Sequence, residues 1–322
     1  MSDPNQNKPD LDSEGLPPSV RRYFYEGKDQ FCRILTLERE RLLDSMRNSR
    51  EVASIDTASG STKPGPNIET TEYIIFSIDP STFEQDFIGS HSIPAHSIRT
   101  SFNTPTLEQD FESPDIIPTY SIRTSFNPTT ELLVVKMVTG EHTQIAFAVH
   151  KAIDEALQQM GLDETINNYA CVDINVGGET KQADMGWGPR RPPRGYPKRP
   201  TVVLEVGVSE TRSKLHRDID LWLDPTRGNA NVAIAIKVNR QRPMISIDKW
   251  IWDAVNGKSL NCQHIEVAES DTDEVKVSGG PLIIPFHLLF LRQPQAPRET
   301  DVVIDQEWLQ NIAEWGWDMQ FQ

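Results

Sequence analysis

Cysteine and long apolar segments are both scarce in this chain. Its three cysteines, Cys32, Cys171 and Cys262, are far apart and show no CxxC or Cys/His spacing, which argues against a disulfide framework and a zinc site. We expect reduced thiols in an intracellular protein, with nucleus or cytoplasm left open. No apolar run approaches the ~20 residues that cross a bilayer, and no apolar leader segment is evident. The sequence therefore predicts no membrane association.

Positive charge is also in short supply. Lysine and arginine total 32 against 47 acidic residues, which gives a net charge of -15 and a pI near 4.9. Binding nucleic acid over a broad surface needs a basic face, so only a local basic patch is compatible with it here. A hydrophobic content of 37% and 23 prolines indicate a folded core diluted by loop-rich or disordered sequence.

The N-terminal part divides into two segments. Residues 1–70 are expected to be a largely disordered extension with a helix at about 20–50, because apolar residues recur at roughly helical spacing. They are Phe24, Phe31, Leu35, Leu42 and Met46. That helix either packs on the domain or binds a protein partner. Residues 71–130 hold lead-in strands and a tandem repeat with an offset of 24 residues, seen where Phe83–Phe87 recurs as Leu107–Phe111.

The remainder is predicted to be α/β. Residues 131–253 form the core. Residues 254–322 are expected to add packing elements, namely edge strands at 262–267 and 275–277 and a terminal helix at 305–317. The core has a mixed central sheet flanked by helices. Its expected elements in order are a helix at 141–160, strands at 170–176, 181–187 and 201–206, a helix at 211–223, and strands at 231–238 and 242–252. Gly161 is expected to end the first helix.

The strand at 201–206 carries a carboxylate that a buried strand does not normally use. Thr201 to Val206 are β-formers without alternation, which indicates burial on both faces, yet Glu205 lies among them. An unpaired buried carboxylate costs several kcal/mol, so Glu205 must be paired, protonated, bound to a metal or placed at an open sheet end. Asp184 closes the preceding strand, so two carboxylates are expected side by side.

This pair predicts a divalent-cation site. Two neighbouring carboxylates repel each other unless a cation lies between them, and Mg²⁺ or Mn²⁺ prefers such oxygen donors. The Val206 carbonyl is the expected third protein ligand. Asp184, Glu205 and Lys214 are the candidate catalytic residues, because Lys214 leans back from the following helix toward the strand ends. Glu141 and His142, at the start of the first helix, are expected at the outer edge of the pocket.

The loop between the two carboxylates is the one strong basic patch in the sequence. It has five basic residues, no acidic residue and two interleaved aromatic residues, a composition that suits phosphate contact and base stacking. Its predicted nucleic-acid contacts are Arg190, Arg191, Arg194, Lys198, Arg199, Trp187 and Tyr196. Two alternatives stay open: an exposed proline-rich loop that offsets the acidic body, and a polyproline-type docking segment.

These residues resemble the PD-(D/E)XK nuclease-like superfamily, and the pattern is closest to its restriction-endonuclease-like group and to fungal proteins of unknown function. The resemblance covers about 131–253 and rests on Ala183-Asp184, Pro200-x-x-x-Leu204-Glu205-x-Gly207 and Lys214-x-x-x-Asp218. It implies a restriction-endonuclease-like αβββαβ core with an N-terminal extension. It also implies metal ligation by Asp184 and Glu205, a lysine that assists water attack, and Mg²⁺-dependent hydrolysis of nucleic acid.

The sequence departs from the family pattern at two positions. Ala183 replaces a proline, and Gly207 replaces the lysine that follows the glutamate. The alternative function is therefore a catalytically inactive member that binds nucleic acid or protein. Structural roles also stay open: Glu205 paired with Lys214 or Arg212, Asp184 capping a turn, Lys214 on a solvated helix face, and His142 as an ordinary helix residue.

Overall fold

The computed structural model describes residues 16, 19–59, 71–88, 122–270, 272 and 274–321, with 46–59 and 321 described by their backbone alone. The chain forms two compact units, one of residues 19–138 and one of residues 139–322 together with 1–18. No described helix is long and apolar enough to cross a membrane. Predictions that fall on 60–70 and 89–121, including most of the tandem repeat, lie outside the described residues.

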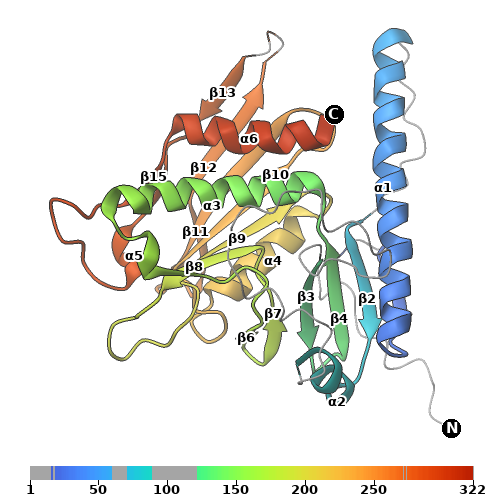
Figure 1. Cartoon of the computed structure of the whole chain (residues 1–322), viewed down its shortest axis with the longest axis horizontal. Helices are drawn as coiled ribbons and strands as arrows, with labels where there is room; N and C mark the ends of the chain where they lie inside the picture. The colour runs from blue at the N-terminus through green and yellow to red at the C-terminus, as the bar shows by residue number, and fades with distance from the viewer. Residues whose placement is uncertain are drawn as a thin grey trace. The chain divides into compact units, whose positions relative to one another are not determined.

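The unit of residues 19–138 is a helix packed on a small sheet (Figure 1). Strand β1 (Arg21–Phe24) pairs in parallel with β2 (Tyr73–Ser77), and β4 (Leu132–Met137) lies antiparallel between β2 and β3 (Ile122–Asn127). The short helical turns α2 (Pro80–Phe83) and η2 (Glu84–Ile88) follow β2. Phe31, Leu35 and Leu42 of helix α1 are buried in this unit's own core.

Helix α1 spans Lys28–Ser59, later than the expected 20–50. Residues 21–24 are extended because they pair with β2, and Gly27 separates strand from helix with a φ of +112°, a conformation that favours glycine. The predicted stripe is therefore correct for Phe31, Leu35 and Leu42 and wrong for Phe24, which lies in β1 and is exposed. A protein partner for this helix stays a prediction.

The unit of residues 139–322 is built on a seven-stranded mixed sheet in the order β13-β12-β11-β10-β9-β8-β5. Strands β9 and β10 run parallel, while β8 and β5 on one side and β11, β12 and β13 on the other pair antiparallel. The strands are β5 (Ile166–Asn168), β8 (Met185–Pro189), β9 (Val202–Gly207), β10 (Val232–Val238), β11 (Met244–Asp253), β12 (Lys258–Glu269) and β13 (Val275–Ser278).

Helices cover both faces of this sheet. Helices α3 (Gly140–Met160) and α6 (Gln306–Phe321) contact each other on one face, as Figure 1 shows. The other face carries α4 (Arg212–Leu223) and the hairpin of β6 (Ile174–Val176) and β7 (Glu179–Lys181). The smaller elements are η4 (Asp163–Thr165), α5 (Phe286–Phe290), and the β14 (Leu282–Ile284) and β15 (Val302–Ile304) pair.

Strand β9 contributes side chains to the apolar cores on both faces of the large sheet. All six of its residues are buried, as the unbroken apolar run predicts. Leu204 and Val206 face the α3 core, whereas Val203 faces the α4 core, because successive side chains point to opposite faces of a sheet. Glu205 has the same parity as Val203, so its carboxylate lies on the α4 face.

Three boundaries differ from the sequence prediction. The strand expected to open the core at 131 is β4, which belongs to the other unit because its backbone pairs with β2 and β3; the division falls after Val138. The strand expected at 181–187 is two strands, β7 and β8, with Asp184 at the bend between them. The strand expected at 170–176 is confined to β6, Ile174–Val176. Within residues 254–322, β12 and β13 extend the central sheet at its edge, as the strands expected at 262–267 and 275–277 predict. Gly161 ends α3 in a left-handed conformation, as predicted.

Candidate functional site

Asp184 occupies the point where β8 stops pairing with β9. The register joins Met185 to Leu204, so Asp184 and Glu205 are the next residues along the two strands. Oδ2 of Asp184 accepts a hydrogen bond of 2.7 Å from the Val206 backbone N–H. The carboxylate thus satisfies a buried backbone donor at the end of the ladder. The N–H and C=O of a strand residue point to one side, so the Val206 carbonyl also faces Asp184.

His142 approaches Asp184 from the first turn of α3. Its Nε2 lies 2.9 Å from Asp184 Oδ2, off the direction of a hydrogen bond, and its Nδ1 has no hydrogen-bond partner among the described residues. Both side chains are at most 1% exposed, and Glu141 beside His142 is equally buried. The structure therefore brings His142 to the predicted carboxylate and places it at a contact distance rather than at an outer edge.

Glu205 is held from the α4 side of the sheet. Its Oε1 accepts a 2.6 Å hydrogen bond from the Trp222 indole N–H and lies 3.8 Å from Nζ of Lys181. The Lys181 ammonium also lies 5.9 Å from the centroid of the Trp222 ring. Glu205 therefore combines a neutral donor with a nearby cation, which offsets the cost of burying its charge.

A chain of alternating charges continues from Glu205 through the α4 face. Nζ of Lys181 lies 3.1 Å from Asp218 Oδ1, and Nζ of Lys214 donates to both oxygens of Asp218 at 2.6 Å. All of these side chains are buried. Burial alone would raise the pKa of Asp218, but the ammonium groups of Lys181 and Lys214 outweigh it and lower the pKa to about 2.

The local sequence positions Lys214 well for this pairing. Thr211 caps α4 by accepting a hydrogen bond from the Lys214 backbone N–H, and Asp218 follows one turn later. Lys214 therefore engages Asp218, and Lys181 places an ammonium beside Glu205. Sequence reasoning missed Lys181. The signal was a lysine in a short strand three residues before Asp184.

The space that a side chain at position 207 would need is taken by Glu210. This is the position at which the resembled pattern has lysine. A Cβ added to Gly207 would lie 2.7 Å from Oε1 and 2.8 Å from Cγ of Glu210. Glu210 is only 2% exposed, so its side chain has little room to withdraw. The glycine is therefore a packing requirement of Glu210, a second buried carboxyl that sequence reasoning missed.

The donors at this strand end are hard oxygens. Two carboxylates and one peptide carbonyl, from Asp184, Glu205 and Val206, are the set that Mg²⁺ or Mn²⁺ takes together with several waters. Within the part of the chain that the structure describes, no group of three or more His, Cys, Asp and Glu is placed to hold a metal. The donor types of Asp184, Glu205 and the Val206 carbonyl thus suit such a cation, but the described side chains form no three-ligand cluster around it.

The basic loop lies at the opposite end of β8 and β9. It connects Pro189 to Val202, whereas Asp184 and Glu205 lie where these antiparallel strands have their other ends. Pro189 comes five positions after Asp184, which is about 16 Å along an extended strand. Arg190, Arg191, Arg194, Lys198 and Tyr196 are exposed and Arg199 is half-buried.

Trp187 is a correction to the predicted nucleic-acid contacts. It belongs to β8, is 1% exposed and packs in the core under α3, where its indole N–H donates to His150 Nδ1 at 3.3 Å. It cannot stack on a base without leaving the core. The signal was the alternation Met185-Gly186-Trp187-Gly188, in which both large side chains point to one face.

The fold is mixed α/β, with helix α3, a set of short strands, buried strand β9, helix α4 and strand β10 following one another as the resemblance implied. No protein-family model matches the sequence, and no curated protein matches it. Among solved structures, a DUF820 protein of Anabaena variabilis, named a candidate nuclease, aligns with 60% of this chain and 90% of its own. The identity is 11% and the TM-score is 0.34, a likeness too weak to assign a function.

Proposed function

We propose that this protein is a metal-dependent nuclease-like protein that hydrolyses phosphodiester bonds of nucleic acid at Asp184 and Glu205. The observation that carries the proposal is that two buried acidic residues, Asp184 and Glu205, occupy neighbouring positions at the shared end of β8 and β9. A buried lysine lies 3.8 Å from one of them. A buried carboxylate with a specific charge partner marks a candidate functional site.

Each residue has a distinct role in this proposal. Asp184, Glu205 and the Val206 carbonyl would hold Mg²⁺ or Mn²⁺, which, when bound, polarises a phosphodiester and lowers the pKa of a coordinated water. The Val206 N–H fixes the orientation of Asp184, and the Trp222 indole fixes that of Glu205. Lys181, rather than the predicted Lys214, supplies the ammonium beside Glu205, and Lys214 positions it through Asp218.

The test is cleavage of labelled DNA and RNA with Mg²⁺ or Mn²⁺ by the wild type, Asp184→Asn and Glu205→Gln. We expect both variants to lose at least about 100-fold in rate, the usual effect of removing an electrostatic catalytic group. The exposed carboxylate of α3 gives a matched control, Glu155→Gln, which should keep wild-type activity. Equal cleavage by all four proteins would refute the site.

Cation binding has a separate readout. Mn²⁺ should raise the melting temperature of the wild type, because a ligand that binds only the folded state stabilises it, and should not raise that of Asp184→Asn.

The second candidate function is a catalytically inactive binding module. The replacement of the usual lysine by Gly207, packed against Glu210, favours it. No cleavage by the wild type, with or without a Mn²⁺ shift, would support this candidate instead.

A further inference from the structure

A cavity of about 700 Å³ lies at the loop end of β8, distinct from the carboxylate site. Its wall is made by η4 and the start of β5, the end of β8, the basic loop and the end of α5. The lining residues are Glu164, Thr165, Pro189, Arg190, Arg191, Pro193, Phe290 and Arg292. Three guanidinium groups thus meet one carboxylate in a protein whose net charge is -15.

The three arginines are held to different degrees. Arg292 is fixed, since it makes contacts of 2.5 and 2.8 Å to the two oxygens of Glu299 and its guanidinium lies over the Phe286 and Phe290 rings at 4.8 and 5.5 Å. Arg292 therefore forms part of the cavity wall, and its charge is already paired with that of Glu299. It leaves the other two guanidinium groups to recognise a ligand.

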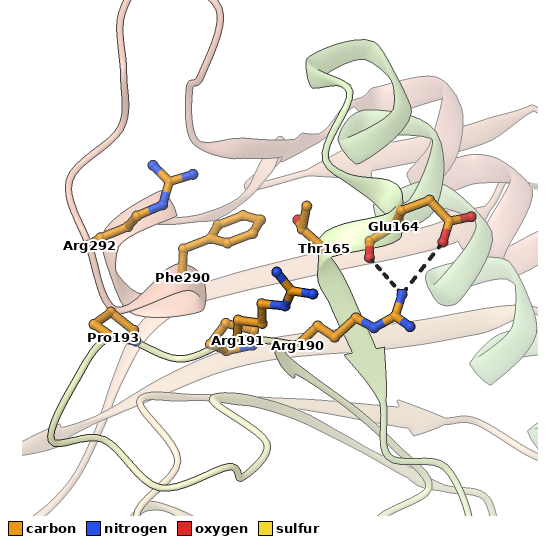
Figure 2. A pocket seen from close by; sticks show the side chains of 8 residues that line it. Glu164, Thr165, Arg190, Arg191, Pro193, Phe290 and Arg292 are labelled. Atoms are coloured by element: carbon orange, nitrogen blue, oxygen red, sulfur yellow. Dashed lines mark hydrogen bonds and ion pairs between the residues drawn. The ribbon is translucent and has the colours of Figure 1, made fainter.

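Arg190 is held only loosely. Its side chain, 61% exposed, lies 3.9 Å from a Glu164 carboxylate oxygen that is itself 89% exposed, and it donates a 3.4 Å hydrogen bond to the Glu164 carbonyl, as Figure 2 shows. Exposed ion pairs of this length contribute little free energy. A phosphate can therefore take the place of Glu164 at small cost.

Arg191 is the arginine most available to a ligand. Figure 2 shows its guanidinium directed into the cavity, between Phe290 and Arg190. The backbone that carries it is fixed, because the Arg190 N–H donates a 2.7 Å hydrogen bond to the Thr165 carbonyl. A guanidinium two residues beyond a fixed strand end presents a planar set of donors that matches two phosphate oxygens.

We propose that this cavity is a subsite for the phosphodiester backbone of a nucleic acid, recognised by Arg191 and Arg190. This proposal rests on the proposed function only for the identification of the ligand as a nucleic acid. Pro189, at the near edge of the cavity, lies about 16 Å from Asp184 along β8, a span of about five base pairs at 3.4 Å per step. A nucleic acid at the carboxylate site would reach it with phosphates remote from the reacting one.

The experiment measures binding of labelled single-stranded DNA, duplex DNA and RNA to the full-length protein in EDTA, where metal-dependent cleavage is absent. Arg191→Gln should weaken binding several-fold and lower the slope of log affinity against log salt by about 1, the expected effect of losing one phosphate contact. Arg190→Gln should act in the same direction. The matched control is Lys276→Gln, which removes an exposed charge on β13 at the opposite edge of the sheet.

The outcomes separate this subsite from the proposed function and from a site for small anions. Wild-type binding that Arg191→Gln and Arg190→Gln leave unchanged would overturn the subsite. The subsite would also be overturned if no nucleic acid bound while inorganic phosphate bound in the cavity. Binding that depends on Arg191 in a protein without cleavage would keep the subsite and reject the nuclease. Cleavage that depends on Asp184, with binding unaffected by Arg191→Gln, would reject the subsite and keep the nuclease.

Discussion

Asp218 shows how single residues are arranged around the candidate site. It lies between Lys181 and Lys214 at distances of 3.1 and 2.6 Å, and it connects α4 to the hairpin that precedes Asp184. Removing one partner of a buried ionic network costs about 3–5 kcal/mol, because it leaves a buried charge uncompensated. Asp218 therefore stabilises the position of Lys181, and through it the charge beside Glu205.

The lowered pKa of Asp218 predicts a specific acid sensitivity. Because the pKa falls from an ordinary 3.8 to about 2 on folding, the stabilisation is complete above pH 4 and is lost as pH drops through 2. We expect this group to contribute about 2 kcal/mol to the free energy of unfolding at neutral pH. Urea unfolding from pH 6 to about pH 2 measures it.

Two variants isolate that contribution. Asp218→Asn should lower stability at neutral pH and flatten its fall below pH 4. Asp220→Asn, on the same helix but half-exposed, should keep the wild-type pH dependence. An unchanged acid slope in Asp218→Asn would show that other carboxyl groups dominate the acid transition.

At the scale of elements, the end of β9 is shaped by its junction with α4. Glu210 folds back from this junction over Gly207, and Thr211 then begins the helix. Lys237, which pairs with Gly207 across β9 and β10, donates a 2.7 Å hydrogen bond to the Val208 carbonyl and so closes the same strand end. The turn therefore disfavours a side chain at 207 whether or not the protein is catalytic.

A double-mutant cycle tests this packing. Gly207→Ala should reduce the free energy of unfolding by about 1–3 kcal/mol, because the new Cβ overlaps buried Glu210. In the Glu210→Ala background, Gly207→Ala should reduce the free energy of unfolding by clearly less. The coupling energy between the two positions is measured from the urea unfolding midpoints. Equal costs in both backgrounds would mean that the backbone, rather than Glu210, requires glycine.

At the scale of the whole molecule, the two units have separate cores. Phe31, Phe76 and Leu133 are buried in the unit of residues 19–138, while the unit of residues 139–322 has its own clusters on the two faces of the large sheet. All seven tryptophans follow residue 139. Indole fluorescence therefore reports on one unit, and circular dichroism reports on both.

This difference predicts two distinguishable unfolding transitions. Leu133→Ala should destabilise its own unit by about 2–5 kcal/mol, the usual cost of a large buried truncation. The circular dichroism transition should broaden or split toward lower denaturant, while the tryptophan transition keeps its midpoint. The matched variant Ile234→Ala in β10 should move the tryptophan transition. A common shift of both signals in Leu133→Ala would show that the units unfold together.

The candidate site could be predicted only in part. Glu205 was identifiable because a carboxylate interrupts a buried run, and Asp184 because it closes the preceding strand. Lys181 and Glu210 were not, since their approach depends on how a hairpin and a turn fold back over β9. The partner of Lys214 was ambiguous for the same reason: a lysine near a helix start reaches either the strand end or the next turn.

The sequence by itself determined the local features: the buried strand β9, the amphipathic helix α3 with its Gly161 stop, the capped helix α4 and the basic loop. Each follows from periodicity, capping or charge within a few residues. Only the tertiary structure decided that Trp187 is core, that the basic loop lies about 16 Å along β8 from Asp184, and that Lys181 accompanies Glu205. Register and the choice of face depend on strands far apart in the chain, and a bend at one residue changes both.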